Sequence, residues 1–302
     1  MTAAKPAEKQ RGASQAAVAW RRFRKNKSAL AGGVIVGFFV FISVYGIFFA
    51  PLPPRDFITC LTNGCTNLPP FTNWTYPLGT EPSGIDVYSE ILHGALGDLY
   101  VGVVATAISV AIGMVVGAFA GYRTGATGAV LLGVTQIFFT LPVLVIILLF
   151  ARIAQVLVAQ GLGLTLIVVI LGIFGWPTIA FVTRGEILRI KELEFVQAAR
   201  SLGASNSRIL FRHILLNVLS PIIVLSSLLV AGNILTEVVI SFLGFGSPGT
   251  STWGLLLQEG FSYVRTSWWV SLFPGIAVVI AVLGFNLLGD GLSDALNPRI
   301  RE

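Results

Sequence analysis

The chain has 302 residues, of which 55% are hydrophobic and only 11% charged, with a formal net charge of +6 and a mean hydropathy of +0.83. Soluble domains carry about 25% charged residues, so this chain has too few charges to cover a water-facing surface. A soluble globular enzyme is therefore excluded, and the high apolar fraction also excludes a disordered chain. The composition predicts an integral membrane protein.

Long uncharged runs predict membrane-spanning helices, because about 20 apolar residues are needed to cross a hydrocarbon core of about 30 Å. Six spans are expected, at residues 29–50, at 99–121, two within 124–183 with a break between 152 and 163, one at 217–243 and one at 266–289. Continuous apolar runs such as 143–150 lack the alternation of barrel strands. The expected fold is an all-α membrane protein with six transmembrane helices.

The distribution of Lys and Arg predicts that both termini are cytoplasmic, because cytoplasmic loops are enriched in these residues. Seventeen of the 20 cations then lie inside, and only Arg55, Arg152 and Arg265 lie outside. The net positive charge is thus a topology signal rather than a sign of nucleic-acid binding. The expected organisation is a cytoplasmic tail with an interfacial amphipathic helix at 1–28, a first transmembrane helix at 29–50, an extracytoplasmic loop at 51–98, a five-helix core at 99–290 that includes an inner loop at 184–217, and a cytoplasmic tail at 291–302.

Both cysteines, Cys60 and Cys65, fall in the expected outer loop. An oxidising outer compartment favours a disulfide between them. A zinc site needs about four ligands, and the two histidines of the chain, His93 and His213, are expected on opposite sides of the bilayer. The sequence therefore predicts no metal site.

Motifs for chemistry are absent from the rest of the sequence. None of the five lysines follows the glycine spacing of a phosphate-binding loop, and no Gly-x-Ser-x-Gly nucleophile motif occurs. The chain is therefore not expected to be an enzyme or to hold ATP itself.

The inner loop at 184–217 is the largest polar interruption of the apolar sequence. Its pattern predicts a helix that is broken at Gly203 and followed by a short second helix. Four residues are spaced as one apolar face of the first helix: Leu188, Phe195, Ala199 and Leu202. Arg208 and Arg212 form an i,i+4 basic pair on the second helix. Such a loop is suited to docking a soluble partner, and an ordinary solvated loop is the alternative.

The segment QAARSLGASNSRILFRHILLN, residues 197–217, resembles the "EAA" loop of type I ABC importer permeases. Further segments resemble the same family in the expected order: 77–90, 241–246, 252–260 and 273–299. Together they point to the dipeptide, oligopeptide and nickel branch. Three positions depart from the family pattern, because Gln197 stands where Glu is usual, Leu216 where Pro is usual, and Ile85 where Arg usually precedes Asp86.

The resemblance implies a multi-subunit importer in a prokaryotic cell membrane. Its expected partners are a homologous second permease, two ATP-binding subunits that hold ATP and Mg²⁺, and an extracytoplasmic solute-binding protein. Import of dipeptides or oligopeptides by alternating access is the function expected first. Nickel or oligosaccharides are alternative substrates, and an ion-coupled carrier or a channel is the alternative of another class.

The resemblance also implies site residues. The residues expected to couple the chain to the ATPase are Gln197, Ala198, Ala199, Gly203, Ala204, Ser205, Arg208 and Arg212. Glu237 lies within the fifth predicted span and has two interpretations. It either faces the substrate pathway, where it meets the amino group of a peptide, or makes a polar contact near the outer end of its helix.

Overall fold

The structure is a computed structural model that describes residues 15–53, 56, 64–123, 125–157, 163–247 and 249–296, and for residues 15–19 and 151–157 only the course of the helix. Its helices are α1 (Gln15–Lys25), α2 (Lys27–Phe49), α4 (Val87–Tyr122), α5 (Ala126–Thr140), α6 (Val143–Leu157), α7 (Gly163–Ile190), α8 (Glu194–Ser201), α9 (Asn206–Arg208), the π-helix η2 (Ile209–Ile214), α10 (Leu215–Ile240), the π-helix η3 (Ser241–Phe245), α11 (Trp253–Ser262) and α12 (Trp269–Leu296).

Five helices are long and apolar enough to cross a membrane: α2, α4, α7, α12 and the continuous helix Asn206–Phe245. The sixth span is the pair α5 and α6, whose helices are bent by 77°. The bend falls at Leu141, which is extended because Pro142 follows it. The predicted all-α membrane fold is confirmed, with six spans when the bent pair is taken as one.

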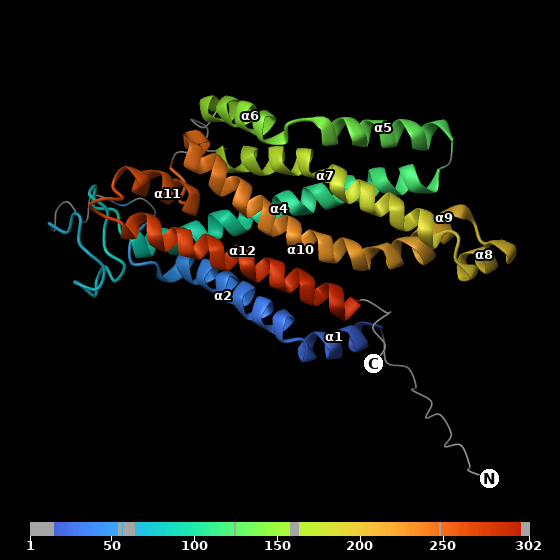
Figure 1. The fold of residues 1–302 in the computed structure, drawn as a ribbon, viewed down its shortest axis with the longest axis horizontal. Coiled ribbons are helices and arrows are strands. Elements are labelled where there is room, and N and C mark those ends of the chain that lie inside the picture. The colour runs from blue at the N-terminus through green and yellow to red at the C-terminus, as the bar shows by residue number, and fades with distance from the viewer. Residues whose placement is uncertain are drawn as a thin grey trace, which may run out of the picture.

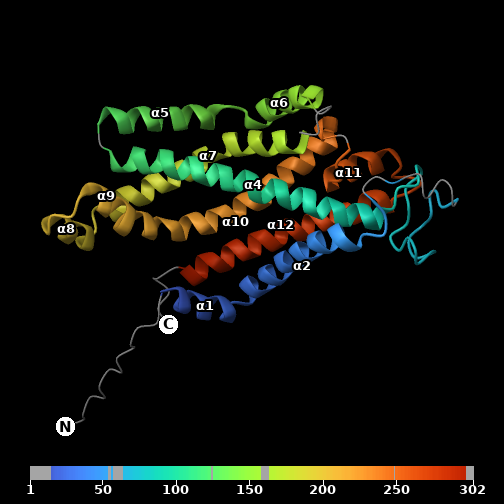
Figure 2. The same ribbon diagram turned by 180° about the vertical axis from the view of Figure 1, so that it is seen from behind.

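The spans lie side by side (Figure 1), and the opposite view shows the same order (Figure 2). The pair α5 and α6 covers α4 and α7, α10 crosses the middle, and α12 and α2 lie beyond it. Glycines allow the closest contacts, as in many membrane helix pairs. A Cβ on Gly117 of α4 would lie only 2.5 Å from the carbonyl oxygen of Ala180 on α7.

The second span is longer than the sequence predicted. Its helix begins at Val87 rather than near residue 99, because the carboxylate of Asp86 accepts the backbone N–H groups of Tyr88 and Ser89 at 3.2 and 3.1 Å. The uncharged run ended at Asp98, but this acid is fully buried inside the helix. The segment before α4 is correspondingly shorter than the expected extracytoplasmic loop.

Residues 64–86 fold against the start of α12 at the end of the molecule where α11 also lies. The indole N–H of Trp269 donates to the carbonyl oxygen of Thr80 at 3.1 Å, and the Thr80 hydroxyl donates to the carbonyl oxygen of Cys65 at 2.6 Å. Cys60 lies outside the described residues. The disulfide between the two cysteines therefore stays a prediction.

Candidate functional site

The segment between α7 and α10 projects beyond the other helices at the end of the molecule opposite α11 (Figure 1). We call residues 191–208 the inner knob, after the inner loop that the sequence predicts here. Its path differs from the prediction in two ways. The expected first helix is divided, because α7 ends at Ile190 and α8 starts only at Glu194. The expected short second helix is the beginning of a long helix, Asn206–Phe245, which includes η2 and η3 and has a kink at Gly244 near its far end.

Gly203 makes the turn of the inner knob. Its φ of +79° lies in the left-handed region, which glycine adopts without penalty. No atom lies within 4 Å of the place that a Cβ would occupy, so the backbone angle alone favours glycine here. The N–H of Ala204 donates to the carbonyl oxygen of Ala199 at 3.1 Å and closes the end of α8. Ser205 then caps the next helix by accepting the N–H of Arg208 at 3.4 Å.

A buried valine anchors α8 to the membrane helices. Val196 is fully buried and belongs to one apolar cluster with Ile187 and Ile190 of α7 and Ile209 of η2. The predicted apolar face, formed by Leu188, Phe195, Ala199 and Leu202, is therefore wrong. The turn between α7 and α8 puts Leu188 on a different helix from the others and leaves Phe195 44% and Leu202 88% exposed.

Gln197 makes a contact that the usual Glu cannot make. Its side-chain N–H donates to the carbonyl oxygen of Glu192 at 3.1 Å, across the turn between α7 and α8. A carboxylate has no proton to donate at neutral pH. The departure from the family pattern thus fits the local geometry.

The remaining predicted coupling residues lie on the inner knob, except Arg212, which lies on η2 directly after it. Ala198, Ser205, Arg208 and Arg212 are exposed, and Ala199 and Ala204 are half-buried. A contact that the sequence analysis missed joins the knob to α4, where the Tyr122 hydroxyl lies 3.0 Å from Oδ1 and 3.1 Å from the carbonyl oxygen of Asn206. No local pattern signals this contact, because the two residues are 84 positions apart.

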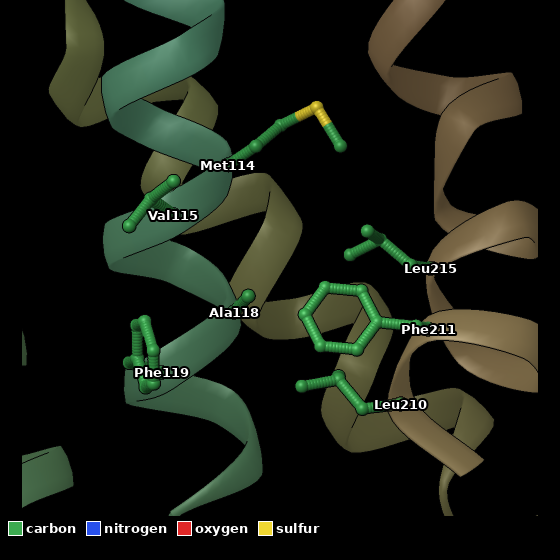
Figure 3. A pocket seen from close by; sticks show the side chains of 7 residues that line it. All are labelled: Met114, Val115, Ala118, Phe119, Leu210, Phe211 and Leu215. Atoms are coloured by element: carbon green, nitrogen blue, oxygen red, sulfur yellow. The ribbon is translucent and has the colours of Figure 1, made fainter. Parts of the chain in front are cut away.

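Just above the knob, η2 and α4 border an apolar pocket of about 220 Å³ (Figure 3). Phe211 and Leu215 point toward Met114 and Ala118 across it. The lining offers no polar group for recognising a polar ligand. Among the described residues, no group of three His, Cys, Asp or Glu side chains is placed to hold a metal ion.

Polar residues meet between α4 and α10 in the half of the molecule that contains α11 (Figure 1). The side-chain N–H of Asn233 donates to the Thr106 hydroxyl at 3.0 Å. One turn further out, Glu237 is fully buried and accepts the Ser241 hydroxyl at 2.6 Å. Glu237 is thus enclosed near the C-terminal end of α10. Asp98 of α4, which the sequence analysis did not single out, lies beside it.

Two family matches cover most of the sequence. Residues 113–302 match the family described as "Binding-protein-dependent transport system inner membrane component". Residues 14–70 match the family described as "N-terminal TM domain of oligopeptide transport permease C".

Similar proteins carry names of the same kind. The chain is 36% identical to the dipeptide transport system permease protein DppC of Bacillus subtilis, over 94% of this chain and 86% of that protein. It is 32% identical to the oligopeptide transport system permease protein OppC of the same organism, over 93% and 88%. It is 33% identical to the glutathione transport system permease protein GsiD of Pectobacterium atrosepticum, over 94% and 91%. The chain therefore belongs to the family of binding-protein-dependent transport system inner membrane components, the permeases of ABC transporters.

Proposed function

We propose that this chain is the permease subunit of an ATP-driven importer of dipeptides or oligopeptides. The observation that carries the proposal is the continuous helix Asn206–Phe245, which joins the inner knob to the outer end of the molecule. Its 40 residues span about 60 Å at 1.5 Å per residue. In this proposal a displacement of the knob is transmitted along this one helical element to the opposite side of the membrane.

In this proposal the inner knob docks on an ATP-binding subunit. The residues that form the docking surface are Gln197, Ala198, Ala199, Gly203, Ala204, Ser205, Arg208 and Arg212. The structure adds Phe195 and Leu202, whose exposed apolar side chains are suited to a pocket on a protein partner. Exposed ion pairs of Arg208 or Arg212 with the partner are each worth about 0 to 1 kcal/mol. The apolar contacts then supply most of the affinity.

The proposed assembly contains a homologous second permease, two ATP-binding subunits and an extracytoplasmic solute-binding protein. Both termini and the knob lie in the cytoplasm, as the distribution of Lys and Arg predicts. ATP and Mg²⁺ belong to the partner subunits, and this chain performs no chemistry. Peptides are favoured as substrates by the names of the dipeptide and oligopeptide permeases that resemble the chain.

Glu237 acts in this proposal as a polar contact at the outer end of α10. Its side chain is fully buried, so it meets no substrate unless α11 moves away. The pathway role for Glu237 then requires an outward-open conformation. Unchanged peptide affinity and uptake rate for Glu237→Gln would exclude the pathway role.

Uptake by the reconstituted complex tests the proposal. Proteoliposomes that contain both permeases and both ATP-binding subunits are supplied with the solute-binding protein and a labelled dipeptide. We expect accumulation that requires ATP, while nickel and an oligosaccharide are not accumulated. Accumulation of nickel or the oligosaccharide instead of the dipeptide would show that peptides are not the substrate. Uptake that persists without ATP would contradict an ATP-driven importer and would indicate an ion-coupled carrier or a channel.

A further inference from the structure

The first turn of α11 is wedged between α4 and α10. A Cβ on Gly94 would lie 2.8 Å from the Trp253 side chain, and a Cβ on Gly254 would lie 2.8 Å from the carbonyl oxygen of Val238. Trp253 is fully buried, and its indole N–H donates to the carbonyl oxygen of Ile91 at 3.1 Å. Backbone contacts on both sides thus fix the place of this turn.

Two carboxylic side chains meet at this wedge. Oδ2 of Asp98 accepts the backbone N–H of Trp253 at 2.9 Å, and Oε1 of Glu237 accepts the Ser241 hydroxyl at 2.6 Å. Asp98 and Glu237 are both fully buried and lie within hydrogen-bonding reach of each other. Their remaining oxygens, Oδ1 and Oε2, find no donor among the described residues. Each acid therefore has one oxygen that accepts a hydrogen bond and one that has no donor among the described residues.

Nearby charges do not explain how two acids are tolerated here. The other titratable side chains on the elements packed at the wedge are Tyr88, Glu90, His93 and Tyr100 on α4, Tyr45 on α2 and Glu259 on α11. At the far ends of these elements lie Lys27 on α2, Tyr122 on α4, Arg184, Glu186 and Arg189 on α7, and Asp290 and Asp294 on α12. Helix α6 carries Arg152, whose side chain lies outside the described residues. Two buried carboxylates in contact repel each other unless one binds a proton.

We propose that Asp98 and Glu237 share one proton and that this pair holds the first turn of α11 against α4 and α10. The protonated acid donates its O–H to the free oxygen of the other, which satisfies both buried oxygens at once. The single negative charge that remains lies at the N-terminus of α11, where the helix dipole and the N–H of Trp253 stabilise it. Loss of the proton leaves two like charges in contact and releases the turn.

Infrared spectroscopy of the purified complex at neutral pH tests the shared proton directly. A protonated carboxylic acid has a C=O stretching band that a carboxylate lacks. In Asp98→Asn and in Glu237→Gln, the side-chain amide donates in place of the proton, so the remaining acid ionises. We expect the band in the wild type and its loss in each variant. Asp290→Asn, which changes an exposed acid on α12, is the control and should keep the band.

The pH dependence of thermal stability is a second test, and it uses only the wild-type protein. The folded pair binds one proton, whereas both acids are ionised in the unfolded chain above about pH 4, so stability should fall as pH rises. In the wild type, the midpoint temperature should therefore fall as pH rises above about 4 while the infrared band persists, and it should level off once the band has disappeared. A wild type without the band, or an amide variant that retains the full band, would overturn the proposal. Neither measurement involves transport, so failure here is distinct from failure of the peptide-import proposal.

Discussion

Substitution of Gly203 by Val perturbs the turn that sets the direction of the inner knob. A left-handed backbone costs an L-residue about 1 to 2 kcal/mol, and a β-branched side chain raises the cost to about 1 to 3 kcal/mol. No clash adds to this cost, because no atom lies within 4 Å of the position that a Cβ would occupy at φ +79°. The total is below the roughly 5 to 15 kcal/mol that keeps a domain folded. The strain should therefore move α8, which is eight residues long, rather than unfold the chain.

We expect Gly203→Val to insert and assemble, to lower substrate uptake, and to uncouple ATP hydrolysis from stimulation by the binding protein. Both activities are measured with the reconstituted complex. Gly185→Val is the matched control, because Gly185 is exposed, helical and has no atom within 4 Å of its Cβ position. Gly203→Asn should be milder, because Asn tolerates the left-handed region. Wild-type uptake and hydrolysis in Gly203→Val would refute a mechanical role for the turn.

Three further substitutions test the packing and the outer cap. Val196→Ala removes the anchor of α8 and should cost about 1 to 3 kcal/mol, with a lower midpoint temperature and weaker uptake; an unchanged midpoint would show that α8 is held otherwise. Gly117→Ala places a methyl group against the carbonyl oxygen of Ala180 and should lower the midpoint of thermal unfolding, whereas Gly133→Ala, with open space, should not; equal midpoints would contradict the close packing of α4 and α7. Burial raises the pKa of the Asp86 carboxyl, so the folded chain binds this proton more tightly and stability falls as pH rises from about 3.9 through the raised value. Asp86→Asn keeps the helix cap and should make the midpoint temperature less dependent on pH in this range, as measured by melting curves at several pH values. An unchanged pH dependence would show that other groups cause it.

The spans were predictable because membrane-length apolar runs have few structural alternatives. Their ends were less predictable. The uncharged run stopped at Asp98, yet α4 extends back to Val87, since a buried acid with partners is tolerated inside a helix. Conversely, the bend between α5 and α6 was visible only as Pro142 after an apolar run. The position of a charge or a proline alone does not show whether a helix continues through it or ends there.

The inner knob was predictable in outline but not in orientation. The sequence indicated a turn at Gly203, yet periodicity across residues 188–202 assumed one uninterrupted helix. The turn after Ile190 changes the face that α8 buries, so Val196 is enclosed instead of Phe195. Contacts between distant segments, such as the pair Asp98 and Glu237, depend on how helices pack and leave no local pattern.

Cross-linking at the inner knob tests the central claim most directly. Leu202→Cys introduces a thiol at a position that is 88% exposed, and a short thiol-reactive photo-crosslinker then reports which subunit lies against it in the assembled transporter. Leu243→Cys, near the far end of the helix Asn206–Phe245 and 49% exposed, is the control. The account predicts that Leu202→Cys cross-links to an ATP-binding subunit, with a yield that changes when ATP is bound, and that Leu243→Cys does not. Absence of that product at Leu202→Cys, or its appearance at Leu243→Cys, would contradict the coupling of ATP hydrolysis through this knob.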